Sequence, residues 1–245
     1  MKKFLPIILF VVGIVVVVGA IMFVRSRKNA TAPGEETTTL PEVALADRPI
    51  ASLAPTSDGH WLDLKVEKIK ISADSMDYEL LYQLPDGRTQ GVPGTITLKG
   101  QTQIERKLLL GSESSGKFRY DEGVKGGTLT LRFRDTQGKL LAKFSTDFAL
   151  LSATKTLATS DGKFTATLST VPAGFFVVMQ TFGAYSNPPA EVAVGPYGLF
   201  ASSSTTLSGS LSLSGAKNIY SSSGTSWTNY KSGDSFSPGI FIGTK

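Results

Sequence analysis

The chain has 245 residues, with 25 lysines and arginines, 20 acidic residues, one histidine and no cysteine. The lack of cysteine excludes disulfides, thiolate metal sites and thiol nucleophiles, and a single histidine excludes a histidine-rich metal site. Five basic residues at the N-terminal end account for the net charge of +5, and the other 20 match the 20 acidic residues in number, with no basic stripe that would favour nucleic-acid binding.

The first predicted element is a hydrophobic helix over residues 4–24. This run carries no charged side chain. At about 1.5 Å per residue it reaches roughly 32 Å, enough to cross the hydrocarbon core of a bilayer. Arg25, Arg27 and Lys28 follow it directly, which is typical of the end of a membrane span. We therefore expect residues 1–28 to form a single-pass membrane anchor.

The same segment leaves two questions open. Lys2 and Lys3, the apolar run and the small residues ending at Ala20 also fit a signal peptide that is cleaved after Ala20. The basic residues on the two sides of the run are balanced, so they do not fix the orientation. We expect a cytoplasmic N-terminus and an extracytoplasmic body at the cell surface, because a soluble body already in the cytoplasm would have no evident need of an anchor.

Residues 29–55 are rich in threonine and proline and hold few clustered apolar residues. Such a segment cannot bury enough apolar surface to offset the loss of chain entropy on ordering. It is predicted to be a flexible linker that holds the following region clear of the membrane.

Residues 56–150 show short alternating segments separated by turn residues. The clearest segment places Leu129, Leu131 and Phe133 on one face, and the turn before residue 139 predicts a hairpin with residues 139–144. About seven such strands in this range fit one immunoglobulin-like β-sandwich.

Charge falls sharply in the last part of the chain. Residues 151–245 contain five lysines and three acidic residues, whereas residues 56–150 contain 27 charged residues. A change of composition at residue 151 predicts a boundary between two domains. The predicted fold class is therefore all-β, with two immunoglobulin-like β-sandwich domains after one N-terminal transmembrane helix and a flexible stalk.

One hairpin of the second region resembles a known family. Residues 161–164 read Asp-Gly-Lys-Phe, Leu168 follows, and residues 172–178 read Pro-Ala-Gly-Phe-Phe-Val-Val. This order is similar to a hairpin of prealbumin-like sandwiches, which include carboxypeptidase regulatory-like and collagen-adhesin B-type repeats of bacterial surface proteins. Fewer than twenty residues carry it, and the isopeptide-forming set of some adhesins has no counterpart. The resemblance implies a sandwich fold and, by analogy, a signal-anchored surface protein.

The candidate binding residues are Tyr220, Trp227 and Tyr230, which lie in a segment rich in serine, glycine and threonine. Rigid aromatic rings among small polar residues are typical of surfaces that bind sugars or proteins. The alternative is that Trp227 fills the core of the second sandwich. The expected partners are the membrane, through residues 4–24, and a surface protein or cell-wall glycan.

Catalytic patterns lack their required context. Ser152 and Lys155 have the S-x-x-K spacing of penicillin-binding proteins, but the segment reads as strand and no K-T-G follows. A Ser-His-Asp triad would need His60, and no G-x-S-x-G elbow accompanies it. We expect no enzyme, cofactor or metal, and a structural, adhesive or protein-interaction role. The alternatives are a glycan-binding module and a hydrolase with an unrecognised site.

Overall fold

The computed structural model describes residues 40–185, 187–224 and 226–245. The regular elements in these ranges are β-strands apart from one short 3-10 turn, η2 (Leu45–Asp47), so the predicted all-β class is confirmed. The predicted anchor at residues 4–24 and the first part of the predicted linker, residues 29–39, lie outside the described residues. Within the described ranges, no helix is long and apolar enough to cross a membrane.

The strands follow one another with short connections. The first nine are β1 (Ile50–Pro55), β2 (Trp61–Glu67), β3 (Ser75–Gln83), β4 (Thr89–Thr97), β5 (Ile104–Leu109), β6 (Gly111–Ser114), β7 (Lys117–Tyr120), β8 (Gly126–Arg134) and β9 (Leu140–Ser152). The remaining nine are β10 (Thr156–Ala158), β11 (Phe164–Leu168), β12 (Phe175–Gln180), β13 (Val192–Ala201), β14 (Leu207–Leu213), β15 (Asn218–Ser222), β16 (Thr228–Tyr230), β17 (Ser235–Phe236) and β18 (Gly239–Thr244).

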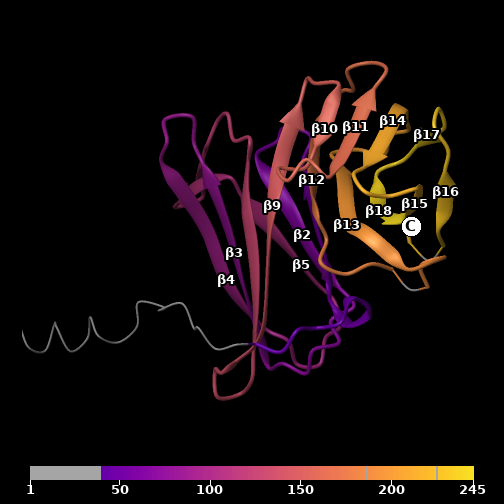
Figure 1. Cartoon of the computed structure of the whole chain (residues 1–245). Helices are drawn as coiled ribbons and strands as arrows, with labels where there is room; N and C mark the ends of the chain where they lie inside the picture. The colour runs from indigo at the N-terminus through magenta and orange to yellow at the C-terminus, as the bar shows by residue number, and fades with distance from the viewer. Residues whose placement is uncertain (1–39, 186, 225) are drawn as a thin grey trace, which may run out of the picture. The chain divides into compact units, whose positions relative to one another are not determined.

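These strands pair into one large antiparallel sheet and three small ones. The large sheet has nine strands in the order β16-β15-β18-β13-β12-β9-β8-β3-β4. A three-stranded sheet, β1-β2-β5, and a four-stranded sheet, β10-β11-β14-β17, stand separately, and β6-β7 forms a hairpin of its own. Figure 1 shows the four-stranded sheet, from salmon at β10 and β11 to yellow at β17, near β13 and β18.

Strand β12 contributes to two hydrophobic cores. Val177 and Met179 belong to the core that lies beneath the β1-β2-β5 sheet. Phe176 and Val178 belong to the core beneath the β10-β11-β14-β17 sheet. Because successive side chains of a strand point to opposite faces, the two small sheets cover opposite faces of the large one where they meet at β12.

The folded unit has two halves, one built around the core beneath the β1-β2-β5 sheet and the other around the core beneath the β10-β11-β14-β17 sheet. The connection after β12 fastens these two halves together. The Ala51 amide donates to the Thr181 carbonyl at 3.0 Å, and the Gly183 amide donates to the Pro49 carbonyl at 2.9 Å. A Cβ atom at residue 183 would lie 2.3 Å from the Arg48 carbonyl oxygen. Only a glycine permits this approach, so the local sequence fits the contact.

The sequence Thr-Ser-Asp-Gly occurs twice, at residues 56–59 and 159–162, and both copies form the same turn. In the second copy the Thr159 hydroxyl donates to Asp161 at 2.6 Å and accepts the Phe164 amide at 3.2 Å. The first copy makes the equivalent bonds. The three-stranded and the four-stranded sheet therefore each begin with a hairpin closed by the same hydrogen bonds, a repeat visible in the sequence.

The predicted boundary between residues 150 and 151 falls within β9, which pairs with β8 on one side and β12 on the other. Strand β1 occupies the last six residues of the range predicted as linker, and most of its residues are buried. Residues 40–245 form one compact unit. The folded part of the chain thus begins before residue 56.

Candidate functional site

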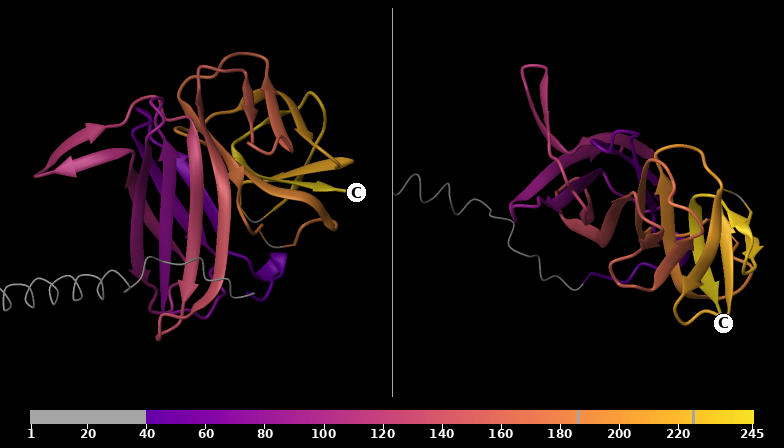
Figure 2. Two further views of the ribbon diagram at one scale, coloured as in Figure 1. Left: turned by 60° about the vertical axis from the view of Figure 1, so that its left-hand side comes forward. Right: turned by 90° about the horizontal axis from the view of Figure 1, so that it is seen from above.

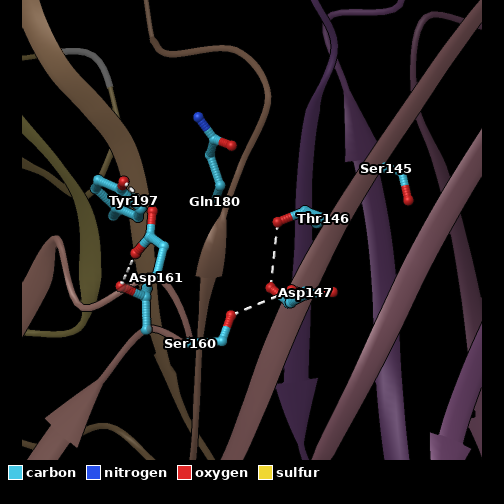
Figure 3. A pocket seen from close by; sticks show the side chains of 8 residues that line it. Ser145, Thr146, Asp147, Ser160, Asp161, Gln180 and Tyr197 are labelled. Atoms are coloured by element: carbon cyan, nitrogen blue, oxygen red, sulfur yellow. Dashed lines mark hydrogen bonds between the residues drawn. The ribbon is translucent and has the colours of Figure 1, made fainter.

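A polar pocket of about 250 Å³ lies where the two halves meet. Its side chains come from β9, from the turn between β10 and β11, from the end of β12 and from the middle of β13 (Figure 3). Asp147 and Asp161 supply its two carboxylates; Tyr197 lies beside Asp161, and Gln180 also lines the pocket. Carboxylates, hydroxyls and an amide can together accept and donate hydrogen bonds.

Asp161 is held by three donors. The Thr159 hydroxyl and the Lys163 amide donate to one oxygen at 2.6 and 3.0 Å, and the Tyr197 hydroxyl donates to the other at 2.7 Å. Burial would raise the pKa of the Asp161 carboxyl, but these hydrogen bonds outweigh it and the pKa lies below its ordinary value. Burial, followed by the bond to Asp161, raises the pKa of Tyr197. Asp161 therefore stays an ionised acceptor and Tyr197 a protonated donor.

Asp147 also accepts hydrogen bonds, in this case from two hydroxyl groups. The Thr128 hydroxyl donates to it across the β8-β9 pair at 3.0 Å, and the Ser160 hydroxyl reaches it from the β10-β11 turn at 3.3 Å. Figure 3 shows this second bond crossing the pocket. In the described part of the chain, no group of three or more histidine, aspartate or glutamate side chains is placed to hold a metal ion. The pocket's polar groups chiefly hold the turn against β9.

A second site is an aromatic cluster formed by His60, Trp61, Phe118 and Tyr120. His60 and Tyr120 are stacked with their ring centroids 4.1 Å apart, and Phe118 lies parallel to Tyr120 at 6.2 Å. The edge of Trp61 meets Phe118 at 5.6 Å. Phe118 is 45% exposed and Tyr120 is 38% exposed, so both rings present apolar area to solvent.

The cluster is supported from β2 and presented by the β6-β7 hairpin. Figure 2 shows this hairpin standing away from the sheets in both views. The His60 ring is oriented by two carboxylates, with Nδ1 3.5 Å from Asp58 and Nε2 3.4 Å from Glu122. The exposed rings of Phe118 and Tyr120 are held in place by their contacts with Trp61 and His60. Such an ordered pair of rings on a short hairpin is suited to contact another molecule.

The three candidate aromatics from the sequence do not share one face. Tyr230 lies opposite Ile219 in the β15-β16 pair, and both pack against the second core. The Tyr230 hydroxyl donates to the Gly209 carbonyl at 3.0 Å. Tyr220 is the neighbour of Ile219 in β15 and therefore points to the opposite face. Trp227 is half-buried just before β16.

Sequence reasoning missed Phe118 and Tyr120. Their signal is the alternation in Lys117-Phe118-Arg119-Tyr120, between the Ser115-Gly116 turn and Asp121. That alternation predicts a strand with one apolar face, and such a face is ordinarily buried. Only the structure reveals that the hairpin carries this face outside the main sheets.

Comparison with models of known protein families, with curated proteins and with solved structures found no match to this chain.

Proposed function

We propose that this chain is a single-pass membrane protein whose two immunoglobulin-like β-sandwich halves act outside the cytoplasm in a structural, adhesive or protein-interaction role. The apolar run at residues 4–24 and the basic residues that follow it support the anchor. The all-β fold and the two cores support the sandwich layout. The N-terminus is on the cytoplasmic side in this proposal.

The aromatic cluster is the observation that carries the interaction role. Four large apolar side chains in the described residues stand out as exposed, and Phe118 and Tyr120, two of them, lie on one four-residue strand. Exposed aromatic rings that are already ordered lose little entropy on binding, and such rings dominate the energetics of protein interfaces. The partner surface in this proposal is therefore the β6-β7 hairpin with its supports.

A photo-crosslinking residue placed at Arg119 in the full chain tests the interaction. We expect one main adduct on intact source cells, lost on Phe118→Ser. Leu81→Ser, which changes a similarly exposed apolar side chain on β3, is the matched control and should leave the adduct in place. Adducts that are unchanged by Phe118→Ser would refute the role given to the hairpin.

Membrane attachment is tested by fractionation. The full chain should remain in the membrane pellet after alkaline carbonate extraction, and protease added outside the cytoplasmic membrane should cleave its body. N-terminal sequencing of the mature chain should find the residues before Ala20 retained. A soluble chain that begins after Ala20, or a body protected within the cytoplasm, contradicts the proposal.

A further inference from the structure

A second hollow lies between β1 and the ends of β13, β15 and β18, with a volume of about 520 Å³. These three strands are neighbours in the nine-stranded sheet, at the yellow and orange end of Figure 1. Tyr185, from the connection between β12 and β13, lines the hollow, as does Ala54 of β1. We name it the serine groove because five serines line it, Ser203, Ser204, Ser222, Ser223 and Ser237.

Two aromatic rings line the serine groove. Phe200 of β13 lies across Gly198, where a Cβ atom would come within 2.4 Å of the ring, so the glycine lets the ring rest against the sheet. Tyr185 is half-buried, and burial together with the nearby Glu67 carboxylate raises its pKa, which keeps the phenol neutral. Both rings thus offer fixed apolar surface at low entropic cost.

Hydroxyl groups supply most of the polar lining. Ser204, Ser223 and Ser237 are exposed in the groove, and their hydroxyls make no hydrogen bond to another side chain or backbone group in the described ranges. Ser222 differs, because its hydroxyl donates to the Gly224 carbonyl at 3.1 Å and so closes a turn. Each unpartnered serine hydroxyl can donate one hydrogen bond and accept two.

Charge is missing from the residues that line the groove. A phosphate or carboxylate ligand would need a cationic partner in the lining, and a cationic ligand would need an acidic one. The volume lies within the range of about 300–1,000 Å³ that is typical of small-ligand sites. The ligand that suits this lining is neutral, carries many hydroxyls and has apolar C–H faces.

We propose that the serine groove binds a neutral carbohydrate. The Tyr185 and Phe200 rings stack on the apolar face of a sugar ring, and the serine hydroxyls exchange hydrogen bonds with its hydroxyl groups. The site is separate from the aromatic cluster on the β6-β7 hairpin and does not depend on it. An uncharged apolar peptide is the competing occupant, and it would leave the serine hydroxyls without a role.

The experiment measures binding of two neutral tetrasaccharides to the detergent-solubilised full chain by isothermal titration calorimetry. One is built of β-1,4-linked glucose and the other of β-1,4-linked N-acetylglucosamine. At least one should bind, and Tyr185→Leu should weaken it tenfold or more. Val171→Ser removes an exposed apolar side chain outside the groove and should leave the dissociation constant unchanged.

A second pair of variants guards against loss of the fold. Ser223→Trp fills the groove from an exposed position and should abolish binding, whereas Ser169→Trp, exposed outside the groove, should not. Unfolding temperatures recorded for all four variants establish that each remains folded. The proposal is overturned if neither tetrasaccharide binds, if binding survives Ser223→Trp, or if an uncharged apolar peptide binds in place of both sugars.

Discussion

Asp161 joins three parts of the chain through one carboxylate: its own turn, the start of β11 and the Tyr197 side chain of β13. An aspartate in an unfolded chain titrates near pH ~3.9. Because the folded-state pKa is lower than that, the ionised carboxylate stabilises the fold at any pH above the unfolded value. This contribution is lost as the pH falls through the folded-state pKa.

The first prediction is therefore that Asp161→Asn lowers the free energy of unfolding at pH 7 by about 1 kcal/mol, a value reduced from that of a buried charged hydrogen bond because Asp161 is exposed on one side. The variant should also lose less stability than the parent chain below pH ~4, since it has no carboxylate to protonate. Urea unfolding over a series of pH values measures both effects. Asp74→Asn, at an exposed carboxylate, is the control and should follow the parent chain.

For a single residue, the sequence predicts which chemical groups are present better than it predicts the face of the sheet to which the side chain points. Tyr220 and Tyr230 look equivalent in a serine-rich segment, yet the register that pairs Ile219 with Tyr230 turns only Tyr230 toward the second core. A shift of one residue would exchange their faces. Sequence spacing alone therefore cannot show whether two candidate binding residues on paired strands lie on the same face, because that depends on the register of the pairing.

The two Thr-Ser-Asp-Gly turns show how a short sequence specifies an element. The threonine hydroxyl caps the strand that follows and bonds the aspartate, while the glycine takes a positive φ of 67° in the second copy, at Gly162. Glycine adopts that conformation without a steric penalty. The hairpin β10-β11 thus has its geometry set by residues 159–162.

Removing the hydroxyl is the second prediction. Thr159→Ala leaves the buried Phe164 amide without its side-chain partner and should destabilise the fold by about 1–2 kcal/mol. Thr159→Ser keeps the hydroxyl and should recover most of the loss. Thermal unfolding followed by circular dichroism measures the difference, and Thr206→Ala, at an exposed threonine, should have little effect. Equal loss in the alanine and serine variants would contradict the assigned role.

Elements with one buried face were predicted well. Leu129, Leu131 and Phe133 are fully buried on β8, and β8 pairs with β9 as the turn before residue 139 indicates. The segment at residues 236–242 is different, because its sequence does not indicate that its two ends belong to different sheets. Pro238 interrupts the segment, so that β17 joins β14 while β18 joins β13 and β15.

At the scale of the folded unit, the distribution of charge predicted two regions and the structure contains two cores, but a shared strand lies between them. Val177 and Val178 are neighbours in β12, both fully buried, and each belongs to a different core. A run of apolar residues in β12 reads as a buried strand without specifying what covers each face. A boundary drawn from composition cannot reveal that one strand serves both cores.

Because β12 belongs to both cores, we predict that the two halves unfold in one transition. The chain contains two tryptophans, Trp61 in β2 and Trp227 just before β16, so Trp227→Phe and Trp61→Phe leave one reporter in each half. Their fluorescence should change at the same urea concentration, since coincidence of independent probes is a mark of two-state unfolding.

Core substitutions extend this prediction. Leu62→Ala in the first core and Leu157→Ala in the second each remove a fully buried side chain, and each should cost about 2–5 kcal/mol. If β12 couples the cores, either substitution lowers the midpoint reported by both tryptophans to the same extent. Two separated midpoints, with Leu157→Ala moving only the Trp227 signal, would mean that the halves fold independently and that β12 remains ordered with the first core alone.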